Sequence, residues 1–277
     1  MDSRHLTHVF SVLIISDYAY LMRWDRRGAV FTERIYYNAH PGFLQFFAAY
    51  ATTPEARGYD QFVTKATREE VEAASEKIEA TIIKAGFEEE INKETPQPLF
   101  VVSMPDLRAE HHRYVIRSFI PRLVFPFGRS TRTFIAYNLQ SKECVFMKDS
   151  WRVEAANAPI EGNIYQTLNQ KGVKNIPKCV SCCDVGEERY HRTQTQSFSE
   201  ASWLGSFEFS SPPLRHHRLI LKSVGRKLNK FTSSRELVRA IRAALVGMSF
   251  MVPSSFTRRL CNFYSSRGSL LPGYPSS

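Results

Sequence analysis

The sequence lacks any hydrophobic run long enough to cross a membrane. Its longest apolar run near the start is Val9 to Ile15, far short of the roughly 18 residues that a transmembrane helix needs. Asp2 precedes this run and no small-residue cleavage site follows it, so we do not expect a secretory signal peptide. The run predicts a buried β-strand, and we expect a protein of the cytoplasm or nucleus without a membrane anchor.

Cysteine is scarce, with five residues in a chain of 277. Cys179 and Cys182 form a CxxC pair, but no second Cys or His pair follows at the spacing of a zinc site. An odd number of cysteines in a chain of this length is more typical of reduced, half-buried thiols than of disulfides. We therefore predict neither a zinc site nor a disulfide framework.

Other common catalytic patterns are also missing. No Gly-x-Ser-x-Gly elbow surrounds Ser150 or Ser206, which excludes the usual hydrolase nucleophile. The pairs His111-His112 and His216-His217 are adjacent in sequence. Neighbouring side chains on a strand point to opposite faces, so each pair would chelate a metal poorly. We predict that these histidines lie on the surface.

The positive charge is concentrated in the last quarter of the chain. The net charge is +10, and residues 209–277 hold twelve of the 37 basic side chains but a single acid, Glu236. Such a segment can bind nucleic acid or an acidic partner. No nucleic-acid motif accompanies it, so we do not expect nucleic-acid binding. It stays an alternative, which a steep salt dependence of affinity would identify.

The composition is that of a folded protein, with 43% hydrophobic and 13% aromatic residues. A strand meander is predicted over residues 8–34 and a short buried helix after Pro41. Thr67 and Glu70 form a capping box, which opens a helix that ends near Gly86. Further strands and helices are predicted over 99–102, 112–120, 123–127, 133–138, 145–148, 161–168, 176–185, 219–224 and 234–245. The mixture indicates an α+β fold.

One strand and one helix carry a pattern of particular interest. The apolar strand Val145–Lys148 presents a lysine, and the helix that follows begins with Glu161. By base rate these would be a surface lysine and a solvated glutamate. The surrounding segments favour another interpretation.

Several segments, taken in order, carry a resemblance to a known family. They are Trp24 to Val30, Arg57 to Asp60, Gly128 to Arg132, Met147 to Arg152, Glu161 to Tyr165, Gly172 to Pro177, Cys183 to Val185, His191 to Thr193 and Leu219 to Leu228. In this order they resemble the small lobe of a protein kinase and the start of its large lobe. More narrowly, the chain is similar to the fungal-type protein kinase family of mushroom-forming fungi over about residues 8–245.

The resemblance implies a domain organisation. Residues 1–95 would form an α+β leader region. Residues 96–245 would form a partial kinase-like domain, with a small lobe of antiparallel sheet and one helix, a hinge, and the first helix of the large lobe. Residues 246–277 would be a basic, disordered tail.

The resemblance also assigns roles to seven residues. Lys148 would bind the phosphates of ATP and pair with Glu161. Gly128, Ser130 and Thr131 would belong to the loop over the phosphates, and Leu221 and Val224 to the hinge that contacts adenine. This loop has one glycine where a typical kinase has three, which leaves less room for backbone amides near phosphate. ATP is thus the implied cofactor, with weakened affinity.

The motifs that a kinase uses for transfer are missing. The sequence contains no His-Arg-Asp followed by Asn and no Asp-Phe-Gly, so the magnesium site is absent. We expect an incomplete, non-catalytic kinase domain, through truncation or a misread exon end; a pseudokinase-like binding or scaffolding module is the alternative. The helix over Leu237–Leu245 would lack its large-lobe cover, which predicts self-association, chaperone contact or a protein partner.

Overall fold

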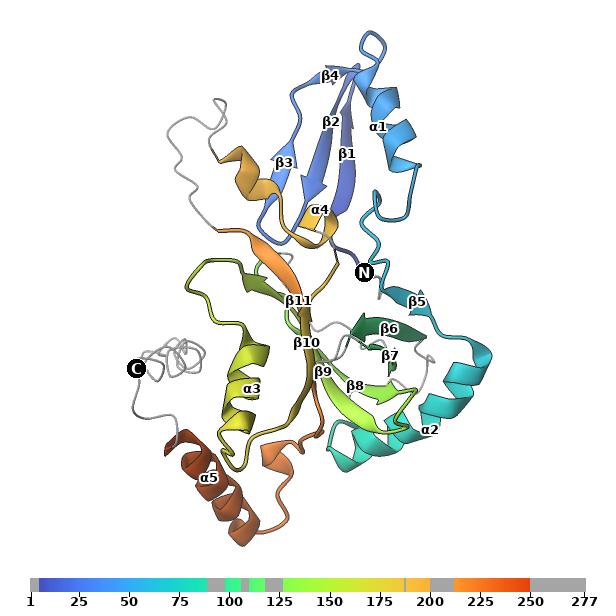
Figure 1. Ribbon diagram of the computed structural model, residues 1–277. Coiled ribbons are helices and arrows are strands. Elements are labelled where there is room, and N and C mark those ends of the chain that lie inside the picture. Colours follow the sequence, from blue (N-terminus) through green and yellow to red (C-terminus); the bar gives the residue numbers. More distant parts are fainter. Residues whose placement is uncertain are drawn as a thin grey trace, which may run out of the picture. The chain divides into compact units, whose positions relative to one another are not determined.

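The computed structural model describes residues 5–88, 98–105, 110–117, 127–186, 188–199 and 212–249 (Figure 1). The chain divides into two compact units. One comprises residues 1–166 and 177–227, and the other comprises residues 167–176 and 228–277. Within the described part, no helix has the length and apolar character that crossing a membrane requires.

A small antiparallel sheet opens the first unit. It consists of β1 (Val9–Ile15), β2 (Tyr18–Trp24), β3 (Ala29–Phe31) and β4 (Ile35–Tyr36), with β2 paired to the other three. The helix α1 (Gly42–Tyr50) places Phe46 and Tyr50 against Phe10 of β1.

The burial predicted for β1 and α1 is wrong. Both elements form, but neither contains a buried residue, and Ile14 is 59% exposed. The physical reason is size, because one short helix covers only part of one face of a sheet.

A larger, seven-stranded sheet follows in the same unit. Its strands are β5 (Val63–Lys65), β6 (Leu99–Pro105), β7 (His111–Arg117), β8 (Arg132–Asn138), β9 (Cys144–Val153), β10 (Cys179–Asp184) and β11 (Leu214–Leu221). The order is β10-β11-β9-β8-β7-β6-β5, with every pair antiparallel. The strand predicted over 123–127 lies mostly outside the described residues, since 118–126 are not among them.

Further helices follow α1, and all but the shortest begin where the sequence predicts. They are α2 (Arg68–Lys84), α3 (Glu161–Gln170), α4 (Glu188–His191) and α5 (Ser234–Ser249), with short 3-10 helices over Thr195–Phe198 and Leu228–Lys230. The capping box of α2 is confirmed. Thr67 Oγ1 accepts from the Glu70 amide at 3.3 Å, and Glu70 Oε2 accepts from the Thr67 amide at 2.9 Å. The predicted α+β class is confirmed.

Two hydrophobic cores occupy the two faces of the large sheet. On one face, the buried side of α2 packs over β6, β7 and β8; this cluster contains Ala74, Ile78, Ile82, Ala85, Leu99, Val101, Val115, Ile135 and Tyr137. The opposite face carries a second cluster that includes Tyr114, Phe134, Met147 and Ile220. Ser181 Oγ of β10 donates to the carbonyl of Pro105 in β6, so the sheet curls around this second core.

The large sheet includes elements that the sequence suggested would belong to the leader region. β5 pairs with β6, and α2 packs on β7, β8 and β9. The domain boundaries at 95 and 245 stay predictions. From residue 250 onward, the expected tail lies outside the described residues.

Candidate functional site

Lys148 and Glu161 form a close ion pair. Lys148 Nζ lies 2.5 Å from Glu161 Oε2, and the two side chains are 16% and 30% exposed. The strand β9 presents the lysine and the first turn of α3 presents the glutamate. A half-buried pair of this kind orients both side chains, because a charge-assisted hydrogen bond is stronger than a neutral one.

The face of the sheet on which Lys148 lies follows from the register. Lys148 is opposite Thr133 of β8 and Leu219 of β11, and directly opposed residues of an antiparallel pair share a face. On that face Ile135, two residues from Thr133, is buried under α2. On the neighbouring strand β11, Leu219 lies on the same face and belongs to a third cluster, against which Tyr165 of α3 packs. Lys148 therefore shares its face with both helices.

The residues predicted to form the phosphate loop precede β8. Gly128 has φ +89°, and a Cβ at this position would meet nothing within 4 Å. Its amide donates to the Arg26 carbonyl at 2.7 Å, and the Arg129 carbonyl accepts from the Trp151 amide at 2.8 Å. Ser130 has φ 39°, and its buried Oγ has no hydrogen-bond partner within the described residues. Thr131 is exposed.

The two predicted hinge residues lie in different environments. Leu221 ends β11 and is buried in the cluster that α3 contacts, whereas Val224 packs against the cluster formed by α2. Shortly afterwards the Lys227 amide donates to the Ala85 carbonyl at 3.0 Å. The segment that follows β11 is thus fixed to the C-terminal end of α2.

Comparison with known protein families gives a match over most of the chain. A family model described as fungal protein kinase matches residues 3–253. The chain belongs to the fungal protein kinase family. No curated protein and no solved structure matches it. The resemblance seen in the sequence is confirmed at the level of the family.

The order of elements agrees with membership of this kinase family. In protein kinases a phosphate loop lies near the start of the small lobe, the lysine is on its third strand, and the glutamate is on the helix that follows. Here β7, β8, β9 and α3 follow one another in that order. Lys148 is on β9 and Glu161 begins α3.

A buried network of charges lies on the opposite face of β9 in this kinase-family chain. Asp149 follows Lys148 directly, and its carboxylate bonds to His216 Nε2 at 2.7 Å and to Arg218 Nε at 3.2 Å. Arg218 also donates to Asp60, and Arg132 lies 3.3 Å from Asp149. Burial opposes ionisation of Asp149, but His216, Arg132 and Arg218 hold its pKa well below the usual range.

The prediction that His216 and His217 lie on the surface is wrong. Their exposures are 2% and 3%, because β11 is paired on both sides, with β9 and β10, and all eight of its residues are buried. The two rings do point to opposite faces. His216 bonds to Asp149, while His217 Nδ1 bonds to Asp184 Oδ1 at 3.0 Å.

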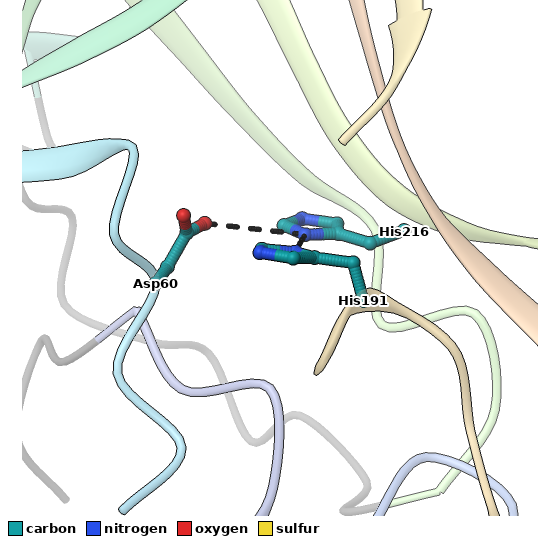
Figure 2. Close-up of side chains that lie close together, drawn as sticks. All are labelled: Asp60, His191 and His216. Atoms are coloured by element: carbon teal, nitrogen blue, oxygen red, sulfur yellow. Dashed lines mark hydrogen bonds and ion pairs between the residues drawn. The ribbon is translucent and has the colours of Figure 1, made fainter. Parts of the chain in front are cut away.

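Figure 2 shows a second contact of His216, made with His191 beside Asp60. The two Nδ1 atoms are 3.0 Å apart and the rings are almost parallel. Burial lowers the pKa of His191 to about 4, so this ring is neutral near pH 7. The sequence reasoning missed the whole network. The signal was available, because a strand that reads Arg-His-His-Arg between apolar residues requires buried acids nearby.

Asp60, His191 and His216 offer three ligand atoms within 4.8 Å of one another. A divalent metal ion could be held by such a set on geometry alone. The charges argue against it, because the carboxylates of Asp60 and Asp149 already balance the guanidiniums of Arg218 and Arg132. A dication would add uncompensated charge in a buried position, which is costly. The network instead joins the segment before β5 to β9, β11 and α4.

Proposed function

We propose that this chain is a non-catalytic, pseudokinase-like member of the fungal protein kinase family. Its small lobe keeps the Lys148–Glu161 pair, while its own helix α2 covers the place where adenine would bind. The observation that supports this proposal is the packing of α2 on the same sheet face that carries Lys148.

The pairing of the strands identifies the residues that would lie against a bound nucleotide. In a kinase the adenine meets the hinge and the phosphates meet the strand lysine. Here that path runs from Leu221 across Phe146 and Ile135, which are opposite one another on β9 and β8. Ile135 is 4% exposed beneath α2, and Phe146 packs against the cluster that α3 contacts. Side chains of the chain itself therefore fill the adenine end.

The phosphate end is more open. Thr133, opposite Lys148, is exposed, and the buried hydroxyl of Ser130 has no hydrogen-bond partner among the described residues. Lys148, Ser130 and Thr131 are the residues that would hold the phosphates of ATP. A bound ATP would supply the phosphoryl group for transfer. The residues thus fit the phosphates of the nucleotide but not its base.

Phosphoryl transfer also needs groups that this sequence does not contain. A kinase orients the substrate hydroxyl with the aspartate of His-Arg-Asp and holds magnesium with an asparagine and the aspartate of Asp-Phe-Gly. None of these motifs occurs among the 277 residues. We therefore expect no phosphoryl transfer from this chain by itself.

Thermal unfolding with and without magnesium-ATP tests the proposal. A ligand that binds only the folded state stabilises it by RT ln(1 + [L]/Kd), so a ligand that binds weakly stabilises it little. With millimolar ATP we expect Tm to change by less than about 1 °C, because filled space at the adenine end keeps occupancy low. Lys148→Ala should show the same small response.

The matched control is Lys77→Ala, which removes an exposed lysine from α2. A stabilisation of several degrees that disappears in Lys148→Ala but persists in Lys77→Ala would contradict the proposal. It would support a nucleotide-binding small lobe instead.

A further inference from the structure

The strand β10 contains an irregularity between its first cysteines. Cys179 pairs with Leu221 and Ser181 pairs with Ile220, so Val180 is an extra residue in the strand. In a regular strand, residues three apart point to opposite faces. The bulge changes this alternation, and Cys179 and Cys182 both join the cluster that contains Leu219.

The two thiols lie close together. They belong to the same packed cluster and interact closely enough for each to shift the pKa of the other. Gln166 Nε2 of α3 also donates to Cys182 Sγ at 3.1 Å. Cys179 is buried and Cys182 is half-buried, so small polar oxidants reach Cys182 more easily.

The surroundings distinguish Cys182 from the other described cysteines. Hydrogen bonding from Cys179, the nearby His217 and the amide of Gln166 lower the pKa of Cys182 to about 7. Burial raises the pKa of Cys183, its neighbour on the other face, to about 11, and burial also raises that of Cys144. Since the thiolate is the reactive form of cysteine, the geometry favours Cys182 as the nucleophile.

We propose that Cys182 and Cys179 form a peroxide-sensitive dithiol, with Cys182 as the attacking thiol and Cys179 as the resolving thiol. The Cys182 sulfur attacks one oxygen of hydrogen peroxide, the O–O bond breaks, and a sulfenic acid and water result. The Cys179 sulfur then attacks the Cys182 sulfur, which forms the disulfide and releases a second water. The two thiols lose two electrons and two protons, and the peroxide is reduced to two waters.

The position of Cys182 gives its oxidation a structural consequence. A Cβ built on Gly162 would lie 2.2 Å from both Cβ and Sγ of Cys182. The backbone of α3 therefore touches this thiol one residue after Glu161. Oxygen atoms or a bulky adduct on Cys182 would displace the helix, whereas a disulfide directs the sulfur toward Cys179. Formation of the disulfide with Cys179 thus leaves α3 in place.

The test is peroxide titration of the full chain, followed by alkylation and mass spectrometry. Trypsin releases Cys179, Cys182 and Cys183 in one peptide that ends at Arg189. We expect this peptide to lose the mass of two hydrogen atoms, with fragmentation placing the bond between Cys179 and Cys182. Cys183→Ser should behave in the same way. Cys179→Ser should stop at a sulfenic acid that dimedone traps on Cys182.

Several outcomes would overturn the proposal. They are a disulfide that still forms in Cys182→Ser, equal oxidation of Cys144, and a peptide that stays reduced while methionines oxidise. A second measurement needs no oxidant. The rate of alkylation at Cys182 should rise with a midpoint near pH 7, well below that of Cys144, and coincident midpoints would also refute the inference. Neither readout depends on nucleotide binding.

Discussion

At the scale of single residues, two neighbours on β9 have different surroundings. Lys148 faces the helices α2 and α3, while Asp149 faces the opposite core and is 1% exposed. Strand alternation alone separates them. The residue that resemblance singled out is the lysine, yet the aspartate has the greater number of buried polar contacts.

Replacing Asp149 tests how much the buried network contributes to the free energy of unfolding. Asp149→Ala leaves Arg218, which is fully buried, with less compensation. Breaking a buried pair from one side costs about 3–5 kcal/mol, so urea denaturation should show a loss of that order or no folding at all.

The control for this variant is Glu143→Ala, which removes a surface contact to Lys222. Those side chains are 4.0 Å apart and more than half exposed. Exposed pairs contribute about 0–1 kcal/mol, so this variant should be close to the wild type. Equal effects of the two substitutions would contradict a structural role for the network.

Buried histidines predict a dependence of stability on pH. The pKa of His191 is about 4 in the folded chain because of burial, whereas an unfolded histidine has a pKa of about 6.5. Between these values the unfolded chain binds a proton that the folded chain does not. Stability should therefore fall as pH falls from about 6.5 to about 4, by about 2 kcal/mol for His191 between pH 7 and pH 5.

Urea midpoints at the two pH values measure this effect. His191→Gln should reduce the difference in unfolding free energy between pH 7 and pH 5, even if it lowers stability overall. His40→Gln, which changes an exposed histidine, should leave that difference unchanged. A His191→Gln chain with the full wild-type difference would refute the prediction.

At the scale of elements, local pattern predicted most helices and strands. The capping box and periodic apolar residues of α2 are contained in a short stretch of sequence, and the structure confirms them. The position of β11 inside the sheet depends on partners far away in the chain, which is why the burial of His216 and His217 was missed. Sequence also showed that α2 has an apolar face, but not which face of which sheet it would cover.

The candidate site also combines features that the sequence predicted with features that depend on distant parts of the chain. The family resemblance implied that Lys148 and Glu161 would pair, and the structure places Lys148 Nζ 2.5 Å from Glu161 Oε2. Their role toward nucleotide stays a prediction, as do those of the loop and hinge residues. The proximity of Cys179 and Cys182 depends on a bulge, and CxxC spacing alone does not reveal a bulge.

Gly162 provides a test of how closely α3 packs on β10. Alanine is the better helix former by about 1 kcal/mol, but a Cβ at this position would overlap Cys182. We expect Gly162→Ala to destabilise the chain by about 1–3 kcal/mol through overpacking, measured by urea denaturation. Gly247→Ala is the matched control in α5, where the nearest atom would lie 3.5 Å away. If both substitutions stabilise, the packing described for α3 is wrong.

At the scale of the whole molecule, α5 leaves apolar side chains exposed. Val238, Ile241 and Leu245 are 63%, 46% and 60% exposed. These three side chains lie on the helix whose apolar face was expected from the sequence to lack cover. We propose that this face mediates self-association or contact with a protein partner, because exposed apolar side chains gathered on one face favour association.

Sedimentation velocity across a range of concentrations tests this proposal. We expect wild-type chain to associate as its concentration rises, and Ile241→Glu with Leu245→Glu to remove the association. Exposed Leu44→Glu in α1 is the control and should leave it intact. A wild-type chain that stays monomeric at every concentration would contradict the proposal.

The central claim is that α2 covers the nucleotide face of a kinase-family small lobe. Hydrogen–deuterium exchange of α2 and β8, with and without magnesium-ATP, tests it most directly. We predict that the amides of α2 exchange as slowly as those of β8, and that millimolar ATP changes neither. Rapid exchange in α2 beside a protected β8, or exposure of α2 when ATP is added, would contradict the claim.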